Sequence, residues 1–383
     1  MIAFILRRIL IAIPLIFLAS VLVFVLVVNA GDPLAGYRER PNSEDIVAQL
    51  EKQWNLDKPV HERYWIWVSD AVTGDFGVDT KGAEVAPKVF DALKITLRMV
   101  LVAFLVAIIL GVAIGVFSAL RQYSKFDYGF TFLAFLFFAM PVFWFAVLLK
   151  QYGAIELNNW LENPSFSWLA VAIITLLFAG VAAVIAGDDR RRKWIAAGST
   201  AAVSVVVLLL LDGWLADQSF SRWISTVGPE TPNFEGSFWA KLGDWVGHLI
   251  LPTITLAVIS FATYSRYQRA SMLETLKSDY VRTARAKGIS EKRVVFRHAF
   301  RTALIPIATL VALDFGVLLG GAIITENIFA WRGMGTMLRS AVLTDIDPNT
   351  AMAVLMITAM TVVVFNIIAD IVYAYLDPRI RLE

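Results

Sequence analysis

The sequence contains no cysteine among its 383 residues, and this absence excludes structural disulfides, catalytic thiols and cysteine-ligated metals. It leaves the cellular compartment open. Histidine is also scarce. His61, His248 and His298 are the three present, and no two of them have the i, i+4 spacing that places two metal ligands on one helical face. A histidine-based metal site is therefore not expected.

The sequence also lacks the motifs that carry common enzymatic chemistry. It has no G-x-x-x-x-G-K-[ST] phosphate-binding loop and no H-E-x-x-H pair. It shows no serine–histidine–aspartate arrangement that a sequence could support. The chain is therefore predicted not to be an enzyme, so any work it performs must be driven by a partner or by an ion gradient.

Charge is sparse as well, because only 17% of the residues are charged while 58% are hydrophobic. Apolar runs of about 20 residues are typical of helices that cross the hydrocarbon core of a bilayer. The runs do not alternate apolar and polar residues, so membrane β-strands are not indicated. The sequence predicts an all-α integral membrane protein with about eight spans: 9–29, 97–119, 128–149, 167–187, 194–212, 248–265, 303–325 and 351–374.

The first apolar run has two readings. Arg7 and Arg8 followed by apolar residues and "VNA" could begin a cleaved signal peptide. The run 9–29 is longer than the core of such a signal, which spans about 7–15 residues. We therefore interpret it as a retained first span.

The distribution of positive charge orients the spans. With the N-terminus placed in the cytoplasm, the segment 30–94 lies outside and carries eight Lys or Arg against twelve Asp or Glu. The segment 326–350, also outside, has only Arg332 and Arg339. The cytoplasmic segments hold most of the cations, at Arg7, Arg8, Arg121, Lys125, "DDRRRK" at 188–193, ten Lys or Arg from Arg266 to Arg301, Arg379 and Arg381. The positive-inside rule is met, and both termini are predicted to be cytoplasmic.

One cytoplasmic segment, residues 278–306, has more features than an orienting loop needs. Asp279 suits the first turn of a helix, where the macrodipole favours an anion, and Gly288 is a natural helix end. A second helix is expected from Ser290, its N-cap, toward Pro306. Small side chains on the first helix would let it seat in a groove of another protein, while the basic residues would pair with acidic rims or anionic lipid. The alternative is a loop whose charges only set the topology.

Several stretches together resemble the permease subunits of ABC importers in the oligopeptide/dipeptide branch. The segment "DYVRTARAKG" at 279–288 resembles the cytoplasmic coupling motif of that family, in which Glu-Ala-Ala is followed by three residues and Gly. Arg282, Thr283, Ala284 and Gly288 occupy the motif positions, and the glutamate is absent, as is usual in the peptide branch. The other matching stretches are "RRILIAIPLIFLASVLVFVL" with "GDP" at 31–33, "GDFG" at 74–77, "MPVFWFAVLL" at 140–149, "LPTITLA" at 251–257, "SMLETLKSDYVRTARAKG" at 271–288 and "TENIFAWRGMG" at 325–335.

The resemblance implies a fold, a function and partners. The fold would be the transmembrane fold of type I ABC importers. The function would be that of the channel-forming subunit of an ATP-driven importer of small peptides in the bacterial cell membrane. The implied partners are a second homologous permease subunit in a heterodimer, two cytoplasmic ATPases, an extracytoplasmic substrate-binding protein, the peptide substrate and membrane lipid, with no nucleic acid. ATP and magnesium would bind to the ATPases, and this chain itself would hold no cofactor.

The resemblance also assigns a coupling site. It would transmit ATP-driven closure of the ATPases to the channel through Asp279, Tyr280, Arg282, Thr283, Ala284, Arg285, Ala286, Lys287 and Gly288. The expected translocation pathway contains Met140, Phe143, Asp314, Glu326 and Trp331.

One region departs from the family pattern. Residues 151–244 fit poorly, because the pair of spans at 167–187 and 194–212 adds a hairpin to the six-span core of the family. Peripheral packing against lipid is the favoured reading of this hairpin, and a docking surface for an extra subunit is the alternative. The expected organisation is a first span at 1–29, a small extracytoplasmic domain at 30–94, core spans at 95–150, the hairpin with an external loop at 151–245, and core spans with the coupling helix at 246–383.

Asp314 supports a different hypothesis, since it is an ionisable residue near the middle of a span, where charge is costly and often functional. It could bond to the partner permease, contact a cationic peptide amine or relay protons. A proton relay would make the chain a secondary transporter, but such transporters tend to show internal repeats, which are not visible here. Two further alternatives remain. One is a permease of the same family for nickel or a modified peptide, and the other is a membrane scaffold without transport.

Overall fold

The computed structural model describes residues 2–39, 44–186, 189–215 and 223–376, and Arg379 and Arg381 lie outside these ranges. Within them the chain is helical, and its one β contact is an isolated bridge between Val78 and Glu84. The chain divides into two units. The first comprises residues 1–147, 227–235 and 248–383, and the second comprises residues 148–226 and 236–247.

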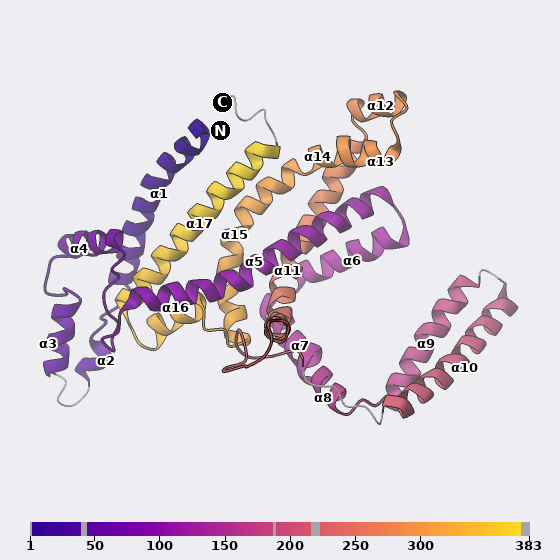
Figure 1. The fold of residues 1–383 in the computed structure, drawn as a ribbon, viewed down its shortest axis with the longest axis horizontal. Helices are drawn as coiled ribbons and strands as arrows, with labels where there is room; N and C mark the ends of the chain where they lie inside the picture. Colours follow the sequence, from indigo (N-terminus) through magenta and orange to yellow (C-terminus); the bar gives the residue numbers. More distant parts are fainter. Residues whose placement is uncertain (1, 40–43, 187–188, 216–222, 377–383) are drawn as a thin grey trace. The chain divides into compact units, whose positions relative to one another are not determined.

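The helices are shown in Figure 1. In chain order they are α1 (Ile2–Val28), α2 (Ala35–Arg38), α3 (Glu44–Gln53), α4 (Val60–Thr73), α5 (Val85–Leu120), α6 (Lys125–Ala139), α7 (Val142–Lys150), the π-helix η1 (Gln151–Glu156), α8 (Leu157–Glu162), α9 (Trp168–Ile185), α10 (Arg190–Leu215), α11 (Phe238–Leu276), α12 (Asp279–Ala286), α13 (Glu291–Arg293), the π-helix η2 (Val294–Ala299), α14 (Phe300–Ala303), α15 (Ile305–Ile328), α16 (Met334–Leu343) and α17 (Pro348–Leu376).

Five of the described helices are long and apolar enough to cross a membrane, and the number rises to seven if each of two bent pairs forms one span. The five are α1, α5, α10, α11 and α17. The pair of α13–α14 and α15 bends by 41°. The described apolar part of α9, Trp168–Ala183, is shorter than the other candidates. The multi-pass topology is confirmed, while the total of eight spans stays a prediction.

The expected span at 128–149 is wrong as a single straight helix. α6 ends at Ala139, Met140 is extended, and the chain bends by 106° before it continues from Val142 to Glu162. The physical reason is Pro141, whose ring disfavours helical dihedrals in the residue before it and which itself lacks an amide hydrogen. A break of this kind forms either a broken span or a re-entrant loop.

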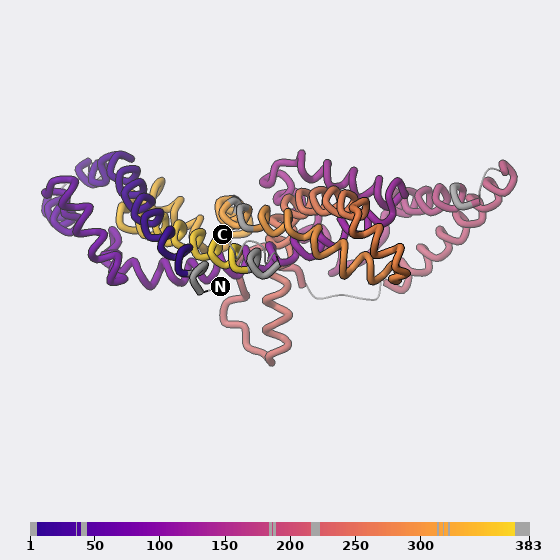
Figure 2. The backbone as a smooth tube through the Cα atoms, turned by 90° about the horizontal axis from the view of Figure 1, so that it is seen from above, coloured from indigo at the N-terminus to yellow at the C-terminus, as the bar shows by residue number. Residues whose placement is uncertain are grey.

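In the first unit, the long helices pack along their lengths. α17 contacts α1, α15 and α16, and α5 contacts α15, α16 and α17. α1 and α17 run side by side in Figures 1 and 2. Gly111 and Gly115 allow α5 to approach α11 closely. A Cβ at Gly111 would lie 2.6 Å from Cβ of Tyr264, and a Cβ at Gly115 would lie 2.6 Å from Cβ of Gln268. This is the close contact that a small-xxx-small spacing permits.

Residues 32–39 and 44–84 form a small helical region at the C-terminal end of α1 and the N-terminal end of α17. Leu34, Leu50 and Trp54 make its own apolar cluster. Trp67 of α4 packs in a second cluster that contains Phe24 of α1 and Met352 of α17. α5 starts at Val85, twelve residues before the expected span at 97–119. The last part of the segment predicted to be external is therefore the first part of this long helix.

The second unit contains the two helices predicted as the hairpin of 167–187 and 194–212. α9 and α10 pack against each other and appear as adjacent rose helices in Figures 1 and 2. Ser167 caps α9 by accepting a hydrogen bond from the amide of Ala170 at 3.2 Å. The carboxylate of Asp212 in α10 accepts one from the amide of Phe166 at 2.6 Å, which closes the open end of the hairpin. The two helices form a hairpin among the described residues, whereas its insertion into a six-span core, its place in the membrane and its role stay predictions.

Candidate functional site

α12 is the helix that the sequence predicted for the coupling segment. It begins after Ser278, carries Asp279 in its first turn and ends at Ala286. Gly288 has a φ of +71°, a left-handed conformation that favours glycine. The amide of Gly288 donates to the carbonyl of Arg285 at 2.9 Å, and the amide of Ile289 donates to the carbonyl of Ala284 at 3.4 Å. The predicted glycine-terminated helix is confirmed, while its coupling role is not tested by this geometry.

One face of α12 is buried within the chain itself. Val281 and Ala284 share an apolar cluster with Met272 of α11 and Val116 of α5. The same cluster takes in residues from the segment after α12, namely Val294, Val295, Ala299 and Ala303. Ala284 is 6% exposed. It therefore cannot seat in a groove of another protein, and its small size serves close packing beneath α12.

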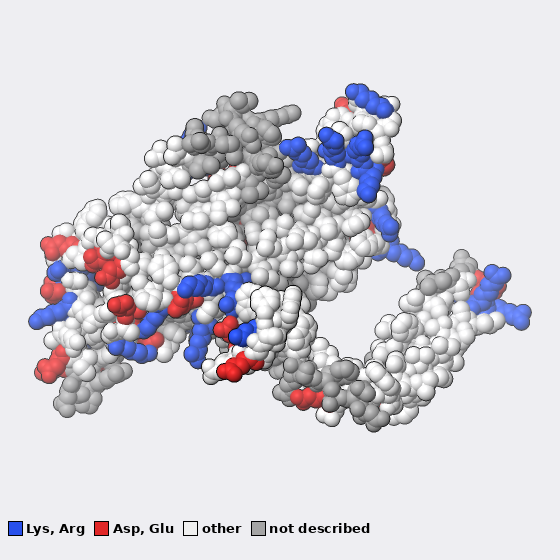
Figure 3. Space-filling view, viewed as in Figure 1, with Lys and Arg blue, Asp and Glu red and all other residues white. Residues whose placement is uncertain are grey.

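The opposite face of α12 is open. Its exposed side chains are Asp279, Tyr280, Arg282, Thr283, Arg285, Ala286 and Lys287. Both charge signs occur on this face, and Tyr280 adds an aromatic ring that is 45% exposed. Arg282 lies 3.4 Å from the carboxylate of Asp279. Figure 3 shows Lys and Arg side chains gathered over α12 and the segments that follow it. This face can contact a partner through mixed polar and aromatic groups.

A two-point ion pair fixes the end of α12 to the next helix. Nε of Arg285 donates to Glu291 at 3.1 Å and its Nη2 donates at 2.7 Å. The hydrogen bond from Arg285 lowers the pKa of Glu291, although slight burial opposes this effect. The pair closes the turn around Gly288, so α12 and α13 are held in one orientation. We call α12, α13 and the apolar cluster beneath them the platform.

Two of the predicted pathway residues are packed into the protein. Glu326 is 0% exposed and Trp331 is 1% exposed. The carboxylate of Glu326 accepts hydrogen bonds from the hydroxyl of Thr96 in α5 and, at 2.9 Å, from the amide of Thr336 in α16. The amide of Trp331 donates to the carbonyl of Glu326 at 2.9 Å. Glu326 thus joins α5, α15 and the first turn of α16, where the chain folds back.

The other three pathway residues lie in different settings. Asp314 is half-buried on α15 and interacts with Tyr264 of α11. Met140 is at the break after α6, and Phe143 is 56% exposed two residues beyond Pro141. The structure therefore brings Glu326 and Trp331 together, but it does not gather all five residues at one place. Their pathway role stays a prediction.

Sequence reasoning missed an ion pair that joins three helices. Arg269 of α11 donates to both carboxylate oxygens of Asp127, at 2.7 and 2.8 Å. The hydroxyl of Ser118 in α5 and the amide of Tyr123 donate to the same carboxylate. Asp127 is 2% exposed. The sequence signal was present in Ser124–Asp127, a helix-capping pattern, but nothing in it identified Arg269 as the partner.

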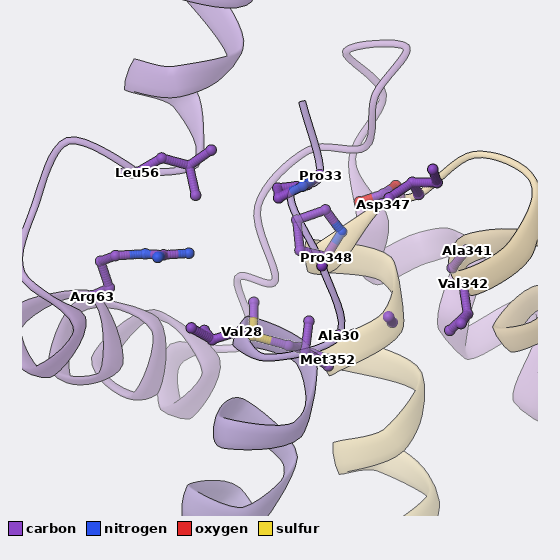
Figure 4. A pocket seen from close by; sticks show the side chains of 14 residues that line it. Val28, Ala30, Pro33, Leu56, Arg63, Ala341, Val342, Asp347, Pro348 and Met352 are labelled. Atoms are coloured by element: carbon purple, nitrogen blue, oxygen red, sulfur yellow. The ribbon is translucent and has the colours of Figure 1, made fainter. Parts of the chain in front are cut away.

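The C-terminal end of α1 and the N-terminal end of α17 border a cavity of about 130 Å³. Figure 4 shows Arg63 of α4 extending toward it, with Pro33, Pro348 and Met352 around it. Asp347 lines the other side, and burial raises the pKa of its carboxyl even though Thr350 donates hydrogen bonds to it. Sequence reasoning did not identify this cavity, because its lining comes from segments about 300 residues apart. Among the described residues, no group of three or more His, Asp or Glu side chains could hold a metal ion.

Comparisons with known proteins identify relatives over the whole chain. Residues 194–382 match the family described as "Binding-protein-dependent transport system inner membrane component", and residues 1–91 match its N-terminal family, "Binding-prot-dependent transport system membrane comp, N-term". The chain is 33% identical over 384 residues to the oligopeptide transport system permease protein AppB of Bacillus subtilis, covering 100% of both chains.

Two further relatives agree with this match. One is the oligopeptide transport system permease protein OppB of Mycobacterium bovis, 33% identical over 379 residues and 98% of each chain. The other is the dipeptide transport system permease protein DppB of Escherichia coli strain K12, 32% identical over 391 aligned positions, which cover 100% of this chain and 99% of the relative. None of these relatives supports the proton-coupled alternative built on Asp314.

Proposed function

Because the chain belongs to the family of binding-protein-dependent transport system inner membrane components, with the transmembrane fold of type I ABC importers, we propose that it is the channel-forming permease subunit of an ATP-driven importer of small peptides. The names of the relatives support the peptide substrate, since they are permeases of oligopeptide and dipeptide transport systems. The import of nickel complexes or modified peptides is the nearest alternative within the same family.

The proposed assembly contains a second homologous permease subunit, two cytoplasmic ATPases and an extracytoplasmic substrate-binding protein in the bacterial cell membrane. The ATPases bind ATP and magnesium and perform the hydrolysis, so this chain carries no catalytic group. Both of its termini face the cytoplasm, as the positive charges at Arg7 and Arg8 favour. The binding protein delivers the peptide at the opposite side.

The observation that carries this proposal is the construction of α12. Its open face is available to an ATPase, and its closed face shares one apolar cluster with α5 and α11. Closure of the ATPases would therefore displace α12 together with two membrane-crossing helices. Since Arg285 and Glu291 fix the turn at Gly288, α12 cannot simply swing away under load. Alternating access follows from the transmission of this movement to the channel.

The test replaces Gly288 in the reconstituted importer. In the Gly288→Val variant, the side chain meets open space among the described residues, so the change acts through the left-handed backbone alone. A β-branched residue is strained there by about 1–3 kcal/mol. We expect peptide uptake per ATP hydrolysed to fall several-fold. Membrane insertion and binding of the second permease subunit should stay normal.

The matched control is Gly288→Asn, because asparagine tolerates the left-handed conformation far better than valine. It should retain most of the coupled uptake. Uptake and ATP hydrolysis should be measured in the same proteoliposomes, loaded with binding protein and peptide. Normal coupling in Gly288→Val, or an assembly that contains no ATPase, would contradict the proposal.

A further inference from the structure

A row of basic residues lies on the outer face of the segment formed by α13, η2 and α14. Lys292, Arg293, Arg297 and Arg301 are all exposed. With Ser290 and Phe296 they line an open groove of about 600 Å³. Figure 3 shows this concentration of positive charge near α12–α14. The groove is separate from the open face of α12, which the proposed function already uses.

The buried residues of the same segment determine the side on which the cations lie. Val294, Val295, Ala299 and Ala303 point into the apolar cluster under α12, and this leaves the cations on the opposite side. The segment is therefore amphipathic, with a buried apolar face and a basic outer face. Because the buried side packs in the same cluster as α5 and α11, this packing determines which face of the segment carries the cations.

The charges of the row are not neutralised within the described part of the chain. None of the four cations forms an ion pair there, and the neighbouring carboxylate of Glu291 is already held by Arg285. Phe296 stands among them and is 53% exposed. An aromatic ring flanked by Lys and Arg is the composition of helices that lie at a membrane surface. Cations and an aromatic ring in this arrangement suit a ligand whose anionic groups lie beside hydrocarbon.

The end of the row nearest α15 lies close to the predicted membrane boundary. Arg301 precedes the start of α15 at Ile305 by four residues, or about 6 Å of helix. The headgroup layer of each leaflet is about 5–8 Å thick. If the hydrocarbon region begins near Ile305, Arg301 and Arg297 reach the phosphates directly. Arg293 and Lys292 lie about 18–20 Å of helix before Ile305, so their contact with phosphates requires the segment to lie obliquely on the leaflet.

The charges on the row differ from those on the open face of α12, and this difference favours lipid over protein as the ligand of the row. The open face of α12 mixes Asp279 with Arg282 and adds Tyr280, as protein surfaces do. The row at 292–301 contains cations and one apolar ring, with no acid on the same face among the described residues. Uniform positive charge fits a surface of repeated phosphates better than a folded partner with its own pattern of charges.

We propose that the groove lined by Lys292, Arg293, Phe296, Arg297 and Arg301 binds the phosphate groups of anionic phospholipids in the cytoplasmic leaflet. Lipid bound there would sit beside the cluster that anchors α12, so the lipid composition would set how firmly the platform is held. The import cycle would then depend on anionic lipid even when the ATPases and the peptide are saturating.

The test uses the complete importer in nanodiscs of phosphatidylcholine alone or of phosphatidylcholine with phosphatidylglycerol. A variant with Lys292, Arg293, Arg297 and Arg301 all replaced by Gln should lose phosphatidylglycerol retained through purification, as measured by native mass spectrometry. Each charge near an anionic surface contributes a factor of roughly five to binding, so we expect a loss of at least tenfold. Stimulation of ATP-driven uptake by phosphatidylglycerol should disappear with it.

Two controls keep the test decisive. Replacement of Arg293, Arg297 and Arg301 by Lys retains the charge and should retain the lipid. Replacement of Arg190, Arg191, Arg192 and Lys193 by Gln removes the same charge from α10. This variant should keep its phosphatidylglycerol at the groove. Crosslinking with a photoreactive lipid locates the bound lipid. The proposal is overturned if the four-Gln variant of the groove keeps its lipid. It is also overturned if inorganic phosphate displaces the lipid completely, or if the loss is of ATPase subunits with lipid unchanged.

Discussion

Asp79 holds the loop before α5 through hydrogen bonds from three neighbours. Its carboxylate accepts from the amides of Lys81 and Ala83 at 2.9 and 2.8 Å, and from the ammonium of Lys88. Burial acts to raise the pKa of Asp79, but these hydrogen bonds outweigh it and leave the pKa below its ordinary value. The charged form therefore stabilises the fold on the side predicted to face outward.

This shift predicts an acid dependence. A carboxyl whose pKa is lowered by folding contributes stability above its ordinary value of 3.8, and the contribution is lost as the pH falls through the lower folded value. Asp79→Asn should cost about 1–2 kcal/mol near neutral pH and flatten the loss of stability below about pH 4. The midpoint of thermal unfolding of the purified protein, measured from neutral to acid pH, checks this.

Asp91→Asn is the matched control for Asp79, because it removes the same charge from a side chain that is 72% exposed. It should change the unfolding midpoint little at any pH. An acid profile that is the same in wild type and Asp79→Asn would contradict the role of this loop.

At the level of single residues, the sequence predicted local geometry well and long-range contacts poorly. Gly288 ends α12 because of its own backbone freedom, which is a local property. Ala284 belongs to the same motif, but its place in the apolar cluster depends on α5 and α11. The contacts of Glu326 with Thr96 and of Arg269 with Asp127 join residues 230 and 142 positions apart, and no local pattern encodes them.

α5 and α11 show the same distinction at the scale of helices. Their apolar runs predicted them as spans, but their full lengths and their close contact did not follow from hydropathy. The spacing of Gly111 and Gly115 was a usable signal, and the run "GVLLGG" at 316–321, after Asp314, is a second small-residue pattern. Gly316 of that pattern does face Val362 of α17, whereas Gly320 has no neighbour within 4 Å among the described residues.

The α5–α11 contact yields a prediction for glycine replacement. At Gly115 a Cβ would lie 2.7 Å from the backbone carbonyl oxygen of Ser265, so the helices must separate. We expect Gly115→Ala to lower the free energy of unfolding by about 1–3 kcal/mol. Gly129→Ala in α6 is the control, since a Cβ there meets nothing within 4 Å among the described residues. Thermal unfolding of both variants in detergent measures the difference. Equal stability would mean that the close contact is not maintained in the folded protein.

For the whole molecule, the natural absence of cysteine makes the predicted orientation directly measurable. Ser69 of α4 is exposed on the side predicted to be outside, while Thr283 of α12 and Arg191 of α10 are exposed on the side predicted to be cytoplasmic. Ser69→Cys should react with a membrane-impermeant maleimide in intact cells. Thr283→Cys, in cells that lack the ATPases, and Arg191→Cys should react only after permeabilisation. Labelling of Arg191→Cys from outside would place the hairpin turn on the other side and overturn the eight-span topology.

α5 connects two apolar clusters that lie at opposite ends of its length. Near its last turn, Val116 and Ala119 lie in the cluster beneath α12, while Val85 and Val89 in its first turns share a cluster with Phe76, Met334 and Val354. With 36 residues it is about 54 Å long. If it turns as a stiff rod about its cytosolic tip, a tilt of about 5° carries its far tip through about 5 Å. In the proposed importer, a rotation of α5 by a few degrees at the end beneath α12 would therefore become a displacement comparable to the width of a side chain at its first turn.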